Sequence, residues 1–140
     1  AVLGGECICD ALDLVERGEA VFTPQNEAEA TRCGMISKGD GAIDFNSSAA
    51  EIDCFVRAMT PWPSAFCTLN GKRIKVLGVL PGELRGEAGS VLAADESHGL
   101  TVGCNGGSVR LADIRPEGKG RMRDVDFLRG NKVEKGAKLQ

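Results

Sequence analysis

The stretch Pro61-Trp62-Pro63-Ser64-Ala65-Phe66 marks a change of secondary structure within the 140-residue chain. Each proline fixes its own φ at about −65°, removes a backbone donor and disfavours helical geometry in the preceding residue. We therefore expect a helix to end before Pro61 and a strand to begin after Pro63. Trp62 is the only tryptophan, and we expect its side chain to fill part of a core at this corner.

A helix is predicted before the corner, over residues 48–59. Ser48 and Glu51 have the S-x-x-E spacing of a capping box, in which each side chain satisfies a free amide of the first turn. Apolar residues then follow at the spacing of one helical face: Ile52, Phe55, Val56 and Met59.

After the corner, five segments separated by turn residues are predicted as strands: residues 65–69, 73–80, 89–94, 100–104 and 108–114. Asn70-Gly71 is a strong hairpin signal. Several short strands at close spacing indicate a small barrel. The predicted fold class is mainly β with flanking helices, an OB-like five-stranded barrel preceded by a helix. Residues 124–129 are predicted as a short helix, and the polar tail from Gly130 is expected to fray.

A further helix is predicted near the start of the chain, over residues 6–17, ending at Gly18. Its apolar stripe consists of Ile8, Ala11, Leu12 and Val15. One short amphipathic helix needs something to pack against, so we interpret it as the end of a larger domain. Residues 21–45 show little periodicity and several Gly and Pro residues, which is typical of a linker.

The composition excludes several classes of function. With 42% hydrophobic and 26% charged residues, the chain reads as a soluble globular protein. Aromatic residues make up 4%, too few for stacking on many single-stranded bases. No apolar run approaches the length of a membrane span, and the acidic first 20 residues do not resemble a signal or transit peptide. We expect no membrane partner.

Charge is distributed unevenly. Residues 1–54 hold 11 acidic and 3 basic residues, whereas residues 55–140 hold 9 acidic and 14 basic residues. This asymmetry indicates two structural pieces and an anionic partner for the second; uneven charge on a solvated surface is the alternative. Basic residues surround the predicted hairpin and recur at every second position after the fifth strand: Lys72, Arg73, Lys75, Lys119, Arg121 and Arg123. Such spacing suits a phosphate backbone, although a solvated loop also fits it.

Residues suited to catalysis or metal binding are scarce. His98 is the only histidine and lies in a polar segment, so we expect it in an exposed turn. None of the six cysteines forms a C-x-x-C pair, so we expect reduced structural thiols in an intracellular protein and no metal site. Cys54, Cys67 and Cys104 follow the apolar pattern. The chain is expected to hold no complete active site and no cofactor site.

On its motifs, the chain resembles the C-terminal part of the methionyl-tRNA formyltransferase family. The matching segments are Ile43-Asp44-Phe45, Ser48-Ala49-Ala50-Glu51-Ile52, Arg57-Ala58, the stretch from Pro61 to Phe66, Asn70-Gly71-Lys72, Pro116-Glu117-Gly118-Lys119-Gly120-Arg121-Met122 and Asp126-Phe127-Leu128-Arg129-Gly130. Phe45 stands where the family commonly has Trp, and Ser64 stands where it commonly has Gly.

The resemblance implies a parent enzyme that transfers a formyl group from 10-formyltetrahydrofolate to the amino group of methionyl initiator tRNA. Residues 1–33 would end its Rossmann-like catalytic domain, 34–46 would be the linker, and 47–140 the OB-like tRNA-binding domain. The catalytic and folate-binding residues would lie in the missing N-terminal part. The basic positions named above would then contact tRNA, with Lys38 and Arg57 as further candidates.

Two alternatives stay open. Formyltransferases that act on amino sugar nucleotides carry similar C-terminal domains, and a stand-alone OB-like interaction module would need no enzyme at all. The expected partner is tRNA rather than DNA. The expected compartment is the bacterial cytoplasm, with the mitochondrial matrix as the other possibility.

Overall fold

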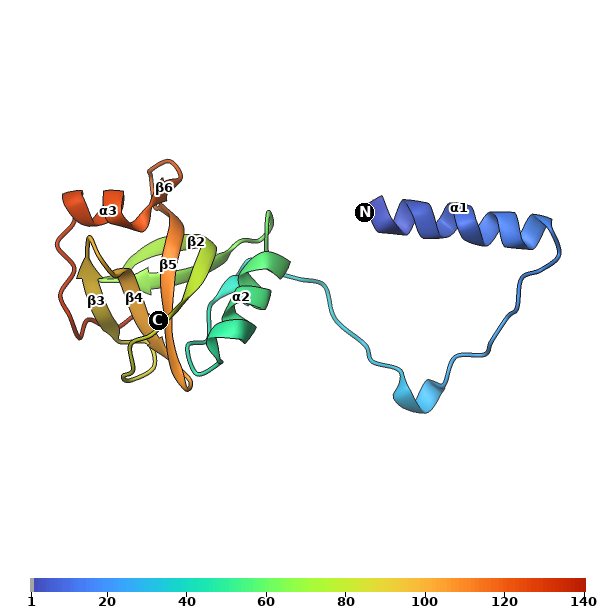
Figure 1. Cartoon of the computed structure of the whole chain (residues 1–140), viewed down its shortest axis with the longest axis horizontal. Coiled ribbons are helices and arrows are strands. Elements are labelled where there is room, and N and C mark those ends of the chain that lie inside the picture. The colour runs from blue at the N-terminus through green and yellow to red at the C-terminus, as the bar shows by residue number, and fades with distance from the viewer. Residues whose placement is uncertain (1) are drawn as a thin grey trace. The chain divides into compact units, whose positions relative to one another are not determined.

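A computed structural model describes residues 2–140, which form two compact units, one reaching to Gly34 and the other covering Met35–Gln140 (Figure 1). The first unit contains α1 (Val2–Glu16) and the single-turn 3-10 helix η1 (Glu27–Glu29). The predicted helix is confirmed, although it begins earlier than expected. Gly18 follows it with φ of +69°, a left-handed geometry that suits glycine after a helix. Within the described part of α1, no residue is buried.

The second unit is built on an antiparallel sheet with the strand order β1-β2-β5-β4-β3, and β6 pairs with β5. Its strands are β1 (Ala65–Leu69), β2 (Lys72–Gly82), β3 (Val91–Asp95), β4 (Gly99–Cys104), β5 (Gly107–Pro116) and β6 (Met122–Arg123). The mainly β fold class is confirmed. The sheet has six strands rather than five because the short β6 folds back onto β5. The OB-like description stays a prediction.

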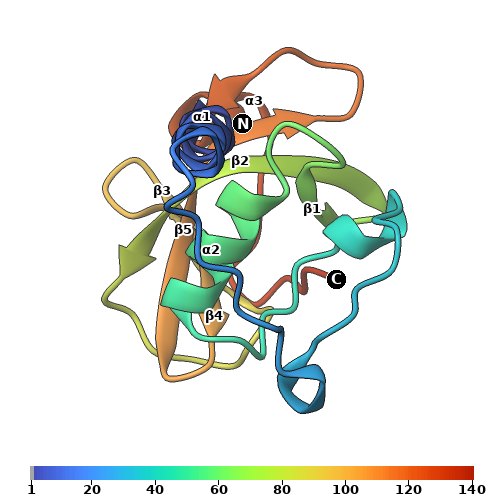
Figure 2. The same ribbon diagram turned by 90° about the vertical axis from the view of Figure 1, so that its right-hand side faces the viewer.

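Two helices flank the sheet, α2 (Ala49–Ala58) and α3 (Asp124–Gly130), and they lie on different sides of it (Figures 1 and 2). The predicted capping box at the start of α2 is confirmed. The Ser48 amide and hydroxyl donate to the Glu51 carboxylate at 2.8 and 2.7 Å, and the Glu51 amide donates to the Ser48 hydroxyl at 3.3 Å. Ile52 and Val56 of α2 are buried, so the helix covers the sheet with its predicted apolar face.

Trp62 does not fill the core, which corrects the expectation from the sequence. Trp62 is 57% exposed, whereas the neighbouring Pro63 and Ser64 are buried. Ser64 has φ of +73°, its amide donates to the Met59 carbonyl at 2.9 Å, and its hydroxyl donates to the Pro61 carbonyl at 2.9 Å. The backbone of the corner packs inward, and the indole side chain is left outside.

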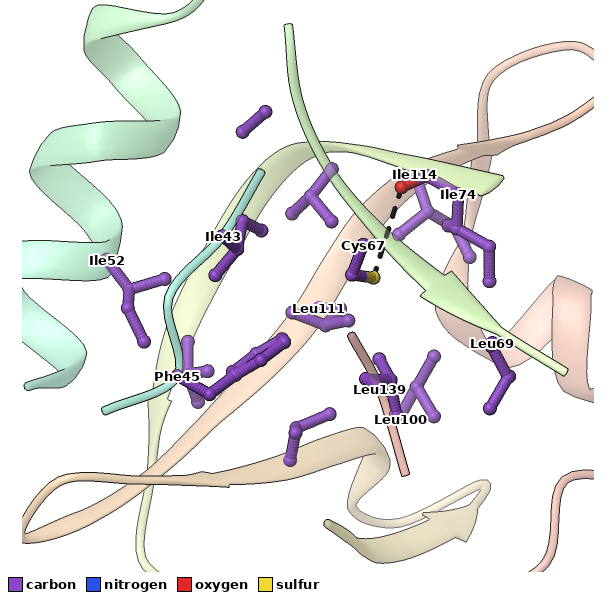
Figure 3. Packing of buried hydrophobic residues seen from close by; sticks show 14 of the residues in the cluster. Ile43, Phe45, Ile52, Cys67, Leu69, Ile74, Leu100, Leu111, Ile114 and Leu139 are labelled. Atoms are coloured by element: carbon purple, nitrogen blue, oxygen red, sulfur yellow. Dashed lines mark hydrogen bonds between the residues drawn. The ribbon is translucent and has the colours of Figure 1, made fainter. Parts of the chain in front are cut away.

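The space near α2 is filled instead by Ile43 and Phe45, which precede the helix. Figure 3 shows both side chains between Ile52 of α2 and Leu111 of β5. All four residues are buried. The segment with the expected linker role therefore contributes two side chains to the core of the second unit.

The C-terminal tail is ordered against the sheet, so the expectation of fraying is wrong. Leu139 is 5% exposed, and its amide donates to the Gly89 carbonyl at 2.7 Å. The tail pairs with Leu69 at the end of β1 and with Ser90 beside β3. Because β1 and β3 are the two ends of the strand order, the tail satisfies backbone groups at both sheet edges.

A buried ion pair fastens α3 to the sheet. The Asp124 side chain is 1% exposed. It accepts bonds from Arg110 Nε at 2.6 Å, Arg110 Nη2 at 3.0 Å and the Leu100 amide at 3.0 Å. Burial by itself would raise the pKa of Asp124, but the bonds from Arg110 and Leu100 outweigh it and hold this pKa below its ordinary value. A Cβ at Gly99 would collide with both Asp124 and Arg110, so glycine is required there.

The cysteines follow the sequence prediction at two of three positions. Cys67 and Cys104 are buried and free, and burial raises the pKa of the Cys67 thiol to about 12. Cys54 is exposed on α2, which corrects its assignment to the core. It lies on the face of α2 that carries Arg57, whose Nη2 is 3.2 Å from the sulfur.

We expect Asp124→Asn to lower the free energy of unfolding at pH 7 by about 3 kcal/mol, because it leaves the Arg110 charge without its partner. The folded-state pKa of Asp124 is depressed, so the carboxylate contributes stability above its unfolded pKa of about 3.9. That contribution is lost as the pH falls through the lower folded-state pKa. The gap between wild type and variant should therefore narrow in acid. Urea unfolding from pH 7 to pH 3 measures it.

Asp126→Asn is the matched control for that experiment, because Asp126 lies on the same helix in an exposed pair with Arg129 at 2.9 Å. It should change stability by less than about 1 kcal/mol. Equal effects of the two variants would contradict the structural role assigned to Asp124.

We expect Leu139→Ala to destabilise the chain by about 2 kcal/mol or more, since it removes a buried side chain from the core. Lys138→Ala, at the neighbouring exposed position, should cost less than about 1 kcal/mol. Urea midpoints and slopes measure both. A frayed tail would instead make the two substitutions equally mild.

Candidate nucleic-acid interface

Cations gather on the outer surface of β2 and β5, which we call the basic face. It consists of Lys72, Arg73, Lys75, Arg115 and Lys119. Lys72 is the first residue of β2, and Lys119 lies in the turn that follows β5. Arg73, Lys75 and Arg115 alternate along the two strands with residues of the core, because Ile74, Val76, Ile114 and Pro116 are buried. Because successive side chains of a strand point to opposite faces, burying the apolar residues places the cations in solvent.

The strand register sets cations directly against each other. Lys75 is the Cα partner of Arg115 in the β2–β5 pair, and Phe66 is the partner of Lys75 in the β1–β2 pair. Phe66, Lys75 and Arg115 thus form a row across three strands. Like charges directly opposite each other destabilise a sheet, so the free protein bears an unfavourable interaction that a bound anion would relieve.

Arg73 is held in place by an aromatic ring. Its guanidinium carbon lies 3.8 Å from the centroid of the Phe66 ring, which is a cation–π contact. This contact orients the guanidinium on the basic face. Because Arg73 already covers the Phe66 ring, this ring is not free to stack on a base. The basic face would therefore contact a ligand mainly through its charges.

Two hollows open on the basic face. The first, of about 360 Å³, is lined by Arg73, Lys75, Arg115, Pro116, Glu117, Gly118 and Lys119. The second, of about 280 Å³, shares four of these residues and continues towards α3. Its further lining residues are Leu69, Asn70, Lys72, Ile74, Phe127, Asn131, Lys132 and Val133. The two hollows adjoin at these shared residues, and we call them together the groove. Six of its fifteen lining residues are basic and one is acidic.

The groove brings together only half of the basic residues that the sequence singled out. Lys72, Arg73, Lys75 and Lys119 line it, and the other four do not. Arg57 pairs with Asp53 at 2.9 Å along α2, and Lys38 is exposed before η2 (Gly39–Gly41). Arg123 is exposed at the N-terminal end of α3.

Arg121 is engaged by an acidic partner on β5. Its Nε lies 3.0 and 2.8 Å from the two carboxylate oxygens of Asp113. These hydrogen bonds raise the pKa of the guanidinium, and they fix the β5–β6 connection that carries Lys119. Arg121 therefore supports the shape of the groove rather than lining it.

Two basic lining residues escaped the sequence analysis. Arg115 lies beyond the predicted end of the fifth strand, which in the structure continues to Pro116. The alternation of apolar and charged residues from Ile114 to Pro116 could have revealed Arg115 as an outward-facing strand residue. It was missed because the strand was expected to end at Ile114. Lys132 falls in the tail that was expected to fray, so only its packing near α3 assigns it to the groove.

No candidate catalytic cluster emerges from residues 2–140. His98 is exposed in the β3–β4 turn, where its Nδ1 lies 2.8 Å from the Ser97 hydroxyl and 3.1 Å from Asp95. Hydrogen bonds from Ser97 and His98 lower the pKa of Asp95. In the described chain, no group of three or more His, Cys, Asp or Glu residues is arranged to hold a metal ion. Nor does any described helix have the length and apolar character of a membrane span.

Known proteins match this chain along nearly its whole length. The methionyl-tRNA formyltransferase of Geotalea daltonii is 39% identical over 99% of the chain, and that of Myxococcus xanthus is 40% identical over 98%. In each case the match covers 44% of the relative, so the chain spans less than half the length of these proteins.

The fold has solved counterparts. A variant of HypX from Aquifex aeolicus matches with a TM-score of 0.59 and 25% identity, over 92% of this chain and 24% of that protein. HypX in complex with tetrahydrofolic acid matches with a TM-score of 0.58 and 23% identity, over 94% of this chain and 26% of that protein. The family model for the formyl transferase C-terminal domain matches residues 35–132, and the chain therefore belongs to the formyl transferase family through this C-terminal domain.

Proposed function

We propose that this chain is the tRNA-holding C-terminal region of a methionyl-tRNA formyltransferase. The observation that carries the proposal is the groove of the basic face, lined by Arg73, Lys75, Arg115 and Lys119. Relatives that bear this enzyme's name align with 98–99% of the chain at 39–40% identity. The whole enzyme would transfer a formyl group from 10-formyltetrahydrofolate to methionyl initiator tRNA. The folate and the catalytic residues would belong to the part of the enzyme outside this chain.

The physical case for tRNA rests on charge and register. A phosphate between Lys75 and Arg115 replaces cation–cation repulsion with two favourable interactions. RNA duplexes are recognised mainly through their backbone and shape, which suits a groove that carries six cations and where the Phe66 ring is already engaged by Arg73. The groove would therefore hold the tRNA body, without reading its sequence.

We further propose the domain roles that the resemblance implies. Residues 1–33 would complete the catalytic domain, 34–46 would link it to the barrel, and 47–140 would carry the tRNA site. Lys38, Arg57, Arg121 and Arg123 would lie at the margins of the bound tRNA. The organisms of the matched relatives are bacteria, which favours the bacterial cytoplasm over the mitochondrial matrix.

We expect tRNA binding to weaken steeply with salt, because phosphate contacts release counterions. Replacing Lys75 and Arg115 together with Gln should lower the magnitude of the slope of log K against log salt by roughly 1.4–1.8, corresponding to two lost phosphate contacts. Fluorescence anisotropy across a salt series measures the slope.

The matched control replaces Arg85 and Lys135 with Gln. Both are exposed in the same unit and neither lines the groove, and the net charge changes by the same amount. An equal loss in both double variants would mean that overall charge, rather than the groove, attracts the tRNA. Absence of tRNA binding by the wild-type chain at low salt would refute the proposed function, and preferential binding of an amino sugar nucleotide would favour the other formyltransferase class.

We expect Lys75→Glu to stabilise the fold while weakening tRNA binding. The substitution converts a repulsive cross-strand pair with Arg115 into an attractive one, worth about 0.5 kcal/mol, or about 2 °C in Tm. Lys75→Gln should fall between wild type and Lys75→Glu in both measurements. Thermal unfolding and tRNA affinity, measured on the same samples, test both expected changes. If Lys75→Glu lowers both Tm and tRNA affinity, Lys75 stabilises the fold and the proposed repulsion with Arg115 is wrong.

A further inference from the structure

We propose that Glu117 makes the groove selective for RNA by accepting a hydrogen bond from a ribose 2′-hydroxyl of the bound strand. The inference rests on the proposed function and adds a specificity residue to it. Glu117 lines both hollows and is the acidic residue in their lining. A carboxylate among the cations of a proposed phosphate site calls for a chemical reason.

Simple neutralisation of the cations does not explain Glu117. Within residues 2–140, its carboxylate forms no ion pair of 4.0 Å or less with any of the surrounding cations. Other carboxylates of the second unit do pair with a neighbouring arginine, as Asp53 and Asp126 do at 2.9 Å. Glu117 therefore keeps its acceptor oxygens available in the groove.

The backbone places Glu117 firmly. Its amide donates to the Arg73 carbonyl at 3.1 Å, and the Lys119 amide donates to the Pro116 carbonyl at 3.1 Å. Pro116 is buried at the end of β5, and Gly118 completes the turn with φ of +72°. Residue 117 is thus fixed beside Arg73 on β2, between the two hollows.

The chemistry of the ligand decides whether such a carboxylate helps or harms binding. A phosphate held by Lys75 and Arg115 is repelled by a nearby negative charge, so a polyanion without hydrogen-bond donors binds at a disadvantage. The ribose of RNA offers a hydroxyl donor at every nucleotide, and this group is what distinguishes RNA from DNA. A hydrogen bond to a charged acceptor is among the stronger ones. With a ribose-containing strand, the hydrogen bond to Glu117 would offset the repulsion between its carboxylate and the phosphates. With any other polyanion the repulsion would remain, so Glu117 would select against it.

The test compares an RNA hairpin with the same hairpin carrying 2′-fluoro groups, which preserve the A-form but cannot donate. The whole chain is used, as wild type, Glu117→Ala and Glu117→Gln. Wild type should prefer RNA by about tenfold, the equivalent of one net hydrogen bond to a charged group. Glu117→Ala should bind the 2′-fluoro hairpin more tightly, because the repulsion is gone, and should bind RNA with nearly unchanged affinity, because the hydrogen bond that offset the repulsion is lost with it. Its preference for RNA should therefore be less than twofold. Glu117→Gln keeps a carbonyl acceptor and should retain an intermediate preference.

Glu83→Gln is the matched control, since Glu83 is exposed and lines neither hollow of the groove. It should leave the preference of the wild type unchanged. If wild type binds both hairpins equally, or if Glu117→Ala strengthens both in the same ratio, Glu117 is only a surface charge and the inference fails while the proposed function stands. If wild type binds neither hairpin nor tRNA at low salt, the proposed function fails with it.

Discussion

The pairing of β2 with β5 ties the core to the basic face. Ile74 and Val76 are buried on one side of β2, and Lys75 points to the other side against Arg115 of β5. Side chains alternate with a period of two, so a slip of one residue would exchange the two faces. The burial of apolar residues therefore specifies the positions of the cations, without any interaction among the cations themselves. The free-energy cost of this charge pattern is the repulsion between Lys75 and Arg115. That cost is small compared with the free energy gained by burying several core residues.

The ends of the sheet are secured by contacts that are distant in sequence. Asp124 joins α3 to β4 and β5 through Leu100 and Arg110, and this helix contributes to the far end of the groove through Phe127. The tail joins the edges formed by β1 and β3. Both contacts act on the frame around the groove without supplying groove cations. Substitutions at Asp124 and Leu139 should therefore alter stability without removing a cation of the groove.

The sequence predicted most of the local structure, and its failures have physical causes. The helix at residues 48–59 and the strand at 65–69 were predictable because capping, periodicity and turn residues act over a few positions. The exposure of Trp62 was not, since the backbone of Pro63 and Ser64 packs inward and the indole cannot follow. The docking of Leu139 depends on unpaired edge strands that only the assembled sheet creates.

The candidate site was predictable only in part. The local density of basic residues identified Lys72, Arg73, Lys75 and Lys119, whereas only the strand register adds Arg115. Of the four expected cations outside the groove, Arg57 and Arg121 have carboxylate partners that spacing alone did not reveal. The other two, Lys38 and Arg123, are exposed elsewhere in the fold.

Electrostatics at the groove is a local property. The whole chain has a net charge of −3, which by itself would argue against a polyanionic partner. The imbalance lies in the first unit, however: residues 35–140 hold 15 basic and 13 acidic residues. At physiological ionic strength, exposed charges more than about 8 Å apart are largely screened from each other. A phosphate entering the groove therefore experiences Arg73, Lys75, Arg115 and Lys119 far more than the acidic residues elsewhere. For the same reason Glu117, which lines both hollows, would influence a strand bound there more than the carboxylates outside the groove.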